Sequence, residues 1–138
     1  MAPASSDIRV GDELELVRTV DAYRALYYAA ASGDFNPIHL DPEVGRQAGL
    51  GGCILQGLCT MAWMVEAVVQ LVGDPSRIVH SRVRFSRPVA IGDTLTFRGK
   101  VVALETGRMT VEVAAVNQRG EDVLKGGVVQ ARLDGGAR

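Results

Sequence analysis

The chain of 138 residues has few of the features that mark several functional classes. Aromatic residues make up only 5% of it, which leaves few stacking platforms for single-stranded nucleic acid. Fifteen basic and sixteen acidic residues give a formal net charge of −1, so no overall field attracts nucleic acid or an anionic membrane surface. We therefore expect neither nucleic acid nor a membrane as a partner.

Cysteine and histidine are also scarce, with two of each in the chain. Cys53 and Cys59 are too few and too close in sequence for a disulfide framework. With His39 and His80 they lack the clustering of a structural zinc site. We interpret the cysteines as small buried thiols in a reducing compartment, and we expect neither a metal ion nor a cofactor. His80 has no acidic residue nearby in sequence and is interpreted as structural or exposed.

Long apolar runs are missing as well. Residues 1–7 are polar and lack the apolar region of a secretory signal. The longest apolar stretch, residues 57–72, is too short for a membrane span and contains three polar residues, so it is predicted to be a buried helix. The length suits one domain, and we expect a cytoplasmic protein with a single domain over 1–138 and a core at about 8–132.

Two further helices are predicted before the buried one. Asp21 is expected to cap a helix through residues 23–31, which Ser32-Gly33 would end. Asp41-Pro42 is expected to open a short helix, with an acidic cap and a proline at the first helical position. Residues 34–40, between these two helices, are predicted to be a polar loop.

Strand patterns fill the second half of the sequence. Apolar and polar residues alternate there with a period of two, which indicates antiparallel strands with one buried face. Val83 and Phe85, for example, would face the core while Arg82 and Arg84 face outward. The pattern predicts strands at 82–85, 94–101, 110–113 and 122–133, turns at 105–108 and 117–120, and a short opening strand at 14–16. A buried helix covered by such an antiparallel meander is an α+β architecture.

Asp34 and His39 are the first candidates for chemistry. They lie on either side of Asn36-Pro37, and a turn braced by proline can bring a carboxylate and an imidazole to one small ligand, such as water. Both groups can accept or return a proton near neutral pH. Spacing alone favours the simpler alternative that Asp34 caps a turn and His39 bonds a carbonyl.

A second candidate is Gln56-Gly57-Leu58, at the start of the buried helix. A helix N-terminus offers unpaired backbone N–H groups and the positive end of the helix dipole. If a thioester carbonyl reached these donors, they could stabilise an enolate oxygen. The alternative is an ordinary glycine entry to a buried helix.

Arg82, Arg84 and Arg87 form a third candidate group. Three arginines close together could bind an acidic group such as the phosphates of coenzyme A. The alternative, which spacing favours, is that they form the solvated face of a strand.

Residues 28–41 resemble the signature of the MaoC-like, (R)-specific enoyl-CoA hydratases and dehydratases. The most specific part is the D-x-N-P-x-H core, in which Asp34, Asn36, Pro37 and His39 are the fixed positions. Residues 54–60 resemble the helix entry of that family, and 83–85, 88–89 and 92–93 resemble its strand pattern. The resemblance extends over roughly residues 8 to 132.

The resemblance implies the hot-dog fold, in which an antiparallel sheet wraps around a long helix, usually in dimers. It implies a lyase of fatty acid metabolism that reversibly hydrates trans-2-enoyl thioesters to (R)-3-hydroxyacyl thioesters. The acyl carrier would be coenzyme A or acyl carrier protein. Asp34 and His39 match the catalytic pair that holds the water and relays its proton. Gly57 matches the position whose N–H receives the thioester oxygen.

Asn36, Gln56 and Leu58 complete the expected site as substrate-binding residues. Asn36 matches the asparagine of the motif, which we expect to orient the loop. Many members have His-Gly where this chain has Gln56-Gly57. Glutamine cannot act as an acid or base but still forms hydrogen bonds, so the departure implies a change of substrate or rate.

We expect a homodimer, or a heterodimer with a related subunit, because one small chain leaves little surface to enclose a long acyl thioester. Two alternatives to an active hydratase remain. One is a non-catalytic or partner-dependent subunit of a heteromeric dehydratase. The other is a hot-dog acyl-CoA thioesterase, since one fold can host both chemistries.

Overall fold

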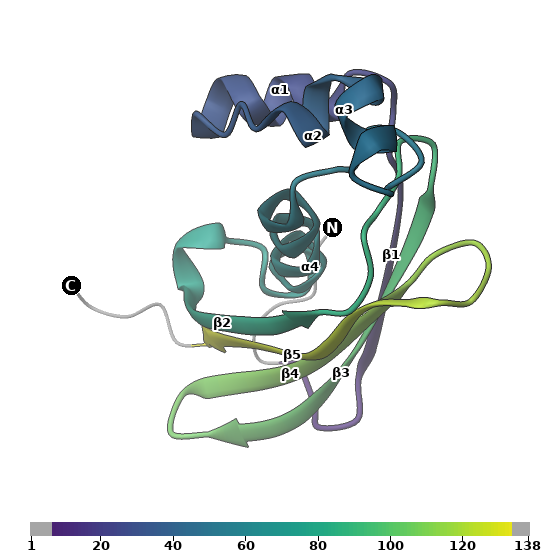
Figure 1. The fold of residues 1–138 in the computed structure, drawn as a ribbon. Coiled ribbons are helices and arrows are strands. Elements are labelled where there is room, and N and C mark those ends of the chain that lie inside the picture. Colours follow the sequence, from purple (N-terminus) through teal and green to yellow (C-terminus); the bar gives the residue numbers. More distant parts are fainter. Residues whose placement is uncertain (1–6, 134–138) are drawn as a thin grey trace.

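A single antiparallel sheet wraps around the long helix α4, Gly57–Val72, in the computed structural model, which describes residues 7–133 (Figure 1). The five strands are β1 (Glu13–Thr19), β2 (Ile78–Phe85), β3 (Thr94–Glu105), β4 (Arg108–Val116) and β5 (Asp122–Arg132). Their order in the sheet is β1-β3-β4-β5-β2. The predicted α+β hot-dog architecture is therefore confirmed.

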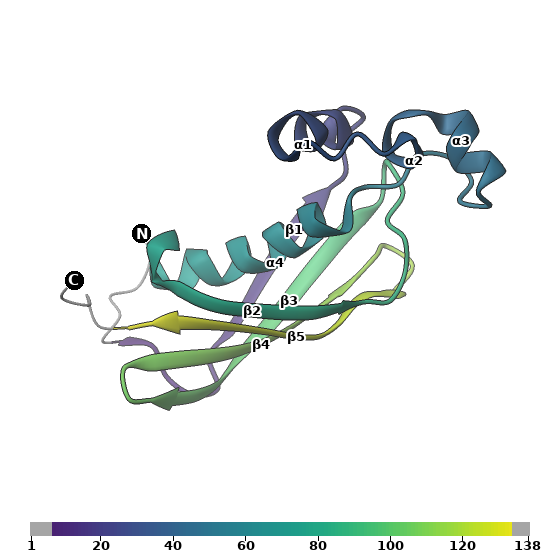
Figure 2. The ribbon, with the colours of Figure 1, turned by 60° about the vertical axis from the view of Figure 1, so that its left-hand side comes forward.

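Three short helices lie together on the side of α4 that faces away from the sheet, near the end where α4 begins (Figure 2). They are α1 (Arg24–Ser32), α2 (Pro37–Leu40) and α3 (Pro42–Gln47). A short 3-10 helix, η2 (Pro75–Arg77), connects the other end of α4 to β2. Within residues 7–133, no helix combines the length and apolar character needed to cross a membrane.

The core lies between α4 and the inner face of the sheet. Met64 and Val68 of α4 are fully buried, as is Phe97 of β3. Trp63 packs edge-on against Phe97, with ring centroids 6.4 Å apart and an interplanar angle of 77°. Burying each such side chain contributes about 1.5–3 kcal/mol to the stability of the fold.

Gly127, on the inner face of β5, allows α4 to approach the sheet closely. A Cβ added at Gly127 of β5 would lie 2.3 Å from the carbonyl oxygen of Val113 and 2.7 Å from the sulfur of Met64. The backbone register places Gly127 directly opposite Val113, and Val113 opposite Gly99 of β3. The centre of the sheet therefore has no room for a side chain at Gly127.

Helix α1 begins later than predicted. Asp21 does not cap it, because its carboxylate accepts hydrogen bonds from Tyr23 N at 3.0 Å and Arg24 Nε at 3.0 Å, which close a turn before the helix. The predicted end of the helix is correct. Gly33 terminates α1 in the left-handed conformation, with φ 80°, which glycine adopts without steric cost.

The segment predicted as a loop at 34–40 contains the one-turn helix α2. Asn36 caps this turn by accepting a hydrogen bond from Ile38 N at 3.2 Å, and Pro37 occupies the first helical position. The predicted helix after Asp41 is confirmed as α3, whose first turn is capped by the Asp41 carboxylate.

The strands were predicted correctly, but their arrangement as one meander was wrong. Only β3, β4 and β5 follow one another in the sheet. The strand expected first in the meander, β2, pairs with β5 at one edge, and β1 pairs with β3 at the other edge. Phe85, expected on the buried face, is 50% exposed, because the register shifts between Arg82 and Arg84 and the Phe85 ring lies beside Gly57.

Replacing Gly127 by alanine tests the close approach of α4 to the sheet. The added methyl group would force the backbone of β4 or the side chain of Met64 to move, so we expect a loss of about 1–3 kcal/mol in the free energy of unfolding. Chemical denaturation measures this loss. Ala114→Val enlarges a side chain on the exposed face next to Val113 and should change stability by less than about 0.5 kcal/mol. Equal stability of Gly127→Ala and the natural chain would contradict the packing argument.

Candidate active site

His39 is buried at the end of the short helix α2 with its ring orientation fixed. Its Nδ1 lies 2.7 Å from the carbonyl oxygen of Ile54. A carbonyl only accepts hydrogen bonds, so Nδ1 carries the proton and Nε2 keeps a free lone pair in the neutral imidazole. That Nε2 lies 3.6 Å from Oδ2 of Asp34.

Asp34 lies between α1 and α2, with its carboxylate partly exposed. Its backbone N–H donates to Ser32 Oγ at 3.1 Å, and its Oδ1 accepts a hydrogen bond from Asn36 N at 3.2 Å. These contacts leave Oδ2 as the oxygen that faces His39. The structure thus brings together the two residues that the sequence singled out.

Two hydrogen-bond acceptors face each other at this point. The distance of 3.6 Å between His39 Nε2 and Asp34 Oδ2 is too long for a direct hydrogen bond. A water molecule carries two O–H donors and can bond one acceptor with each. The arrangement can therefore accept both hydrogen bonds of one water molecule.

The first turn of α4 presents free backbone donors beside this pair. Gln56 is the N-cap residue of α4, and its side chain does not cap the helix. Among residues 7–133, neither Gly57 N–H nor Leu58 N–H has a protein acceptor, whereas Cys59 N donates to Gln56 O at 3.0 Å. A Cβ added at Gly57 would lie 3.2 Å from the ring of Phe85, so glycine keeps this approach open.

A cavity of about 330 Å³ joins His39 to the start of α4. Its walls are mostly apolar and come from the end of α2, the start of α4 and the segment after β2. The lining residues are His39, Ile54, Leu55, Gly57, Thr60, Phe85, Ser86, Arg87, Pro88 and Val89. Seven of these residues were not predicted as site residues: Ile54, Leu55, Thr60, Phe85, Ser86, Pro88 and Val89. All except Ser86 lie in the segments 54–60, 83–85 and 88–89 that carried the resemblance.

The three expected substrate-binding residues occupy different positions. Leu58 is 61% exposed and does not line the cavity. Gln56 is 1% exposed, and its Nε2 donates to the carbonyl oxygens of Ala25 at 2.9 Å and Asp34 at 3.4 Å. Asn36 caps α2. In the structure, Gln56 and Asn36 thus contact the backbone of the segment that carries Asp34 and His39.

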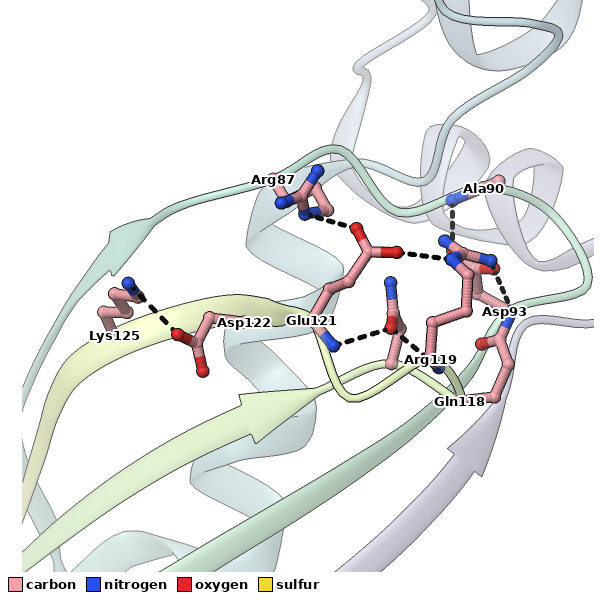
Figure 3. Close-up of polar contacts among 9 residues, drawn as sticks. Arg87, Ala90, Asp93, Gln118, Arg119, Glu121, Asp122 and Lys125 are labelled. Atoms are coloured by element: carbon pink, nitrogen blue, oxygen red, sulfur yellow. Dashed lines mark hydrogen bonds and ion pairs between the residues drawn. The ribbon is translucent and has the colours of Figure 1, made fainter.

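The arginines of the third candidate group do not form one cluster. Arg82 lines a separate hollow of about 730 Å³ on the other face of the sheet, among exposed charged residues of β1, β3 and β4. Arg87 lines the cavity beside His39 and forms an ion pair with Glu121 at 2.8 Å. Figure 3 shows this pair at the turn between β4 and β5.

A polar network holds the segment that carries Arg87 (Figure 3). The buried carboxylate of Asp93 accepts hydrogen bonds from Ala90 N at 2.9 Å and Gln118 Nε2 at 2.8 Å. Glu121 accepts from Arg119 Nε at 2.5 Å, and hydrogen bonding to Arg119 and the charge of Arg87 hold the pKa of Glu121 below its usual value. These contacts tie one wall of the cavity to the turn between β4 and β5.

Both cysteines are free thiols. Cys59 is buried in the first turns of α4, and burial raises the pKa of its thiol, which keeps the thiol protonated and unreactive at neutral pH. Cys53, also expected to be buried, is partly exposed, because it lies in the connecting segment just before Ile54.

The sequence of the chain is similar to parts of two larger peroxisomal proteins. The peroxisomal enoyl-CoA hydratase 2 of Arabidopsis thaliana is 37% identical over 105 residues, which cover 75% of this chain and 32% of that protein. The peroxisomal multifunctional enzyme type 2 of Drosophila melanogaster is 36% identical over 110 residues, covering 72% of this chain and 18% of that protein. The chain thus spans a third or less of the length of these two relatives.

Solved structures of similar size match along most of the chain. The R-hydratase PhaJ1 of Pseudomonas aeruginosa, in its unliganded form, superimposes with a TM-score of 0.84 at 26% identity, covering 94% of this chain and 84% of that one. The (R)-hydratase of A. caviae involved in PHA biosynthesis superimposes with a TM-score of 0.83 at 25% identity. The match covers 91% of this chain and 98% of that one. The family described as the MaoC like domain matches residues 8–122. The chain therefore belongs to the MaoC-like domain family.

Proposed function

We propose that this chain is an (R)-specific enoyl-CoA hydratase, which adds water reversibly to trans-2-enoyl thioesters. The observation that carries the proposal is the pair of acceptors, His39 Nε2 and Asp34 Oδ2, which lie 3.6 Å apart. His39 lines a cavity that is also lined by Gly57, whose N–H is free at the start of α4. The names of the (R)-hydratases and of the enoyl-CoA hydratase 2 that it resembles support the same reaction and the same stereochemistry.

Water addition needs a group that takes a proton and a group that returns it. A water held by Asp34 and His39 loses one proton to this pair as its oxygen forms the bond to the β-carbon. The electrons of the carbon–carbon double bond move toward the thioester, which becomes an enolate. The pair then returns a proton to the α-carbon, and the thioester carbonyl forms again. Removal of water from a 3-hydroxyacyl thioester is the same path in reverse.

The negative charge of the enolate needs donors that are in place before the reaction. The N–H of Gly57 points out of the first turn of α4, where the helix dipole adds a partial positive charge. A thioester oxygen bonded there gains most when it becomes negative, so the contact lowers the barrier more than it strengthens substrate binding. Because Gly57 and His39 line one cavity, one bound thioester can reach both.

Arg87 is the residue that we propose to bind the anionic acyl carrier. It lies at the cavity wall on the exposed segment after β2, and its ion pair with Glu121 leaves about half of its side chain exposed. Coenzyme A carries phosphates that an arginine recognises well. Arg82 lines the other hollow, so we do not assign it to the carrier.

We also propose that two copies of the chain associate through the edge strand β2. An edge strand presents unpaired backbone N–H and C=O groups, and β2 also exposes Val79 and Phe85. A solved neighbour, the ChsH1-ChsH2 complex of Mycobacterium tuberculosis, contains two different subunits and superimposes at a TM-score of 0.81, with 28% identity over 90% of this chain and 98% of that one. The association of two subunits in that complex supports a dimer.

Asp34→Asn and His39→Ala test the proposed chemistry. Each removes one proton acceptor, and we expect the kcat for crotonyl-CoA hydration to fall about 100-fold or more. Asp41→Asn is the matched control, because asparagine still caps α3 and kcat should stay unchanged. Unchanged turnover in both site variants would contradict the proposal. Release of free thiol without a 3-hydroxyacyl product would instead identify a thioesterase.

Arg87→Ala tests the carrier contact. Loss of a charge-assisted hydrogen bond to a phosphate should raise the KM for crotonyl-CoA by roughly tenfold, or about 1.4 kcal/mol. The KM for crotonyl-pantetheine, which has no phosphate, should not change. Arg98→Ala removes the same charge from the other face of the sheet and serves as control. Equal KM changes for the two thioesters of the Arg87 variant would exclude the phosphate contact.

The oligomeric state is tested by the mass of the pure chain in solution. We expect twice the chain mass of 14.7 kDa, measured by size-exclusion chromatography with light scattering. A mass of one chain would contradict the homodimer. If that monomer is inactive and gains hydratase activity only when a related chain is added, the partner-dependent subunit is the correct alternative.

A further inference from the structure

Gln56 uses its side chain in a way that is unusual for its position. A residue at the N-cap of a helix commonly accepts a hydrogen bond from the N–H groups of the first turn. The Gln56 side chain makes no such bond. It points instead toward α1, where Nε2 donates to Ala25 O at 2.9 Å and to Asp34 O at 3.4 Å. The first N–H groups of α4 therefore stay free.

The orientation of this amide follows from its partners. Both partners are carbonyl oxygens, which only accept, so the nitrogen of the amide must face them. The other amide atom, Oε1, is then buried without a hydrogen-bond partner among the described residues. A buried unpaired oxygen costs about 1–3 kcal/mol, and an apolar side chain of the same size would fill the space without this cost. Packing alone does not explain a glutamine here.

The segment from Ile54 to Gly57 contacts both catalytic candidates, His39 and Asp34, and also contains the proposed oxyanion donor. The carbonyl oxygen of Ile54 holds the ring of His39. The side chain of Gln56 holds the backbone of Asp34. The N–H of Gly57 is the proposed donor to the thioester oxygen. One short stretch of backbone thus sets the positions of the imidazole, the carboxylate and the oxyanion donor relative to one another.

We propose that Gln56 is a positioning residue, which fixes the Asp34 carboxylate relative to His39 and Gly57 through the backbone carbonyl of Asp34. The expected effect on kcat rests on the proposed function, whereas the contact between Gln56 and Asp34 is independent of it. Asp34, Phe35 and Asn36 form a stretch outside any helix, and the other hydrogen bonds of Asp34 are to near neighbours in sequence, Ser32 and Asn36. The contact with Gln56 ties this stretch to the start of α4. A shift of about 1 Å in a catalytic group can cost roughly 100-fold in rate.

Gln56→Met is the variant that removes the contact while keeping the size of the side chain. We expect kcat for crotonyl-CoA to fall about 10-fold to 100-fold, with KM nearly unchanged, because substrate contacts remain. Gln56→His restores an N–H donor and should recover part of the lost kcat. Met109→Ala, a cavity mutation in the fully buried core of β4, is the control that lowers thermal stability without changing kcat.

Hydrogen exchange gives a readout that does not depend on activity. In Gln56→Met, amide exchange should become faster in residues 33–41 and stay unchanged in the strands. Wild-type kcat in Gln56→Met, or an equal kcat loss in Met109→Ala, would overturn the positioning role. If the natural chain hydrates no enoyl-CoA, the proposed function fails. Faster exchange confined to 33–41 would then still support the contact between Gln56 and Asp34, and unchanged exchange would refute it.

Discussion

The burial of α4 against the inner face of the sheet is the contact on which the rest of the structure depends. Met64 and Val68 of the helix are fully buried, and the Met64 sulfur lies over Gly127 of β5, where there is no room for a side chain. Close packing of this kind leaves the helix no freedom to slide. The first turn of α4 is therefore fixed relative to the strands, although it lies beside the cavity.

That fixed first turn is the reference point of the proposed site. The chain enters it through Ile54 and Leu55, and Leu55 N bonds the backbone of Val89 at 2.8 Å, which joins the entry to the segment after β2. On the other side, the entry holds α2 through His39, and Gln56 holds the start of α1 and the backbone of Asp34. The cavity thus lies between two segments that are both attached to the start of the helix. His39 and the N–H of Gly57 thus both lie at the cavity, with Asp34 beside His39.

The elements with a strong local signal could be predicted from the sequence. The apolar run at 57–72 gave both ends of α4, because Gly73 terminates it with φ 76°. The alternation of apolar and polar residues predicted the strands, because successive side chains of a strand point to opposite faces and only one face is buried. It could not give the position of β2, because alternation does not determine which strand is the neighbour. The one-turn helix α2 was also missed, since four residues are too few to show a period.

Some residues of the candidate site could likewise be predicted from the sequence, and others could not. Asp34, His39 and Gly57 could be found because a motif of fixed spacing and a helix start are visible in sequence. The position of Gln56 could not, because its partners, Ala25 O and Asp34 O, are backbone atoms brought near by tertiary packing. Arg82 and Arg87 are separated because Arg82 lies on the outer face of β2 whereas Arg87 lies beyond the end of that strand, at the cavity. In both cases the contact belongs to the fold and not to the local sequence.

In the proposed site, one bound thioester contacts the start of α4 and the Asp34–His39 pair at the same time. A crystal structure of the Asp34→Asn variant with crotonyl-CoA, in which turnover is slow, would show whether it does. We expect the thioester oxygen to lie within hydrogen-bond distance of Gly57 N and the β-carbon to face His39 Nε2. A thioester bound away from Gly57, or with its β-carbon turned away from His39, would contradict it.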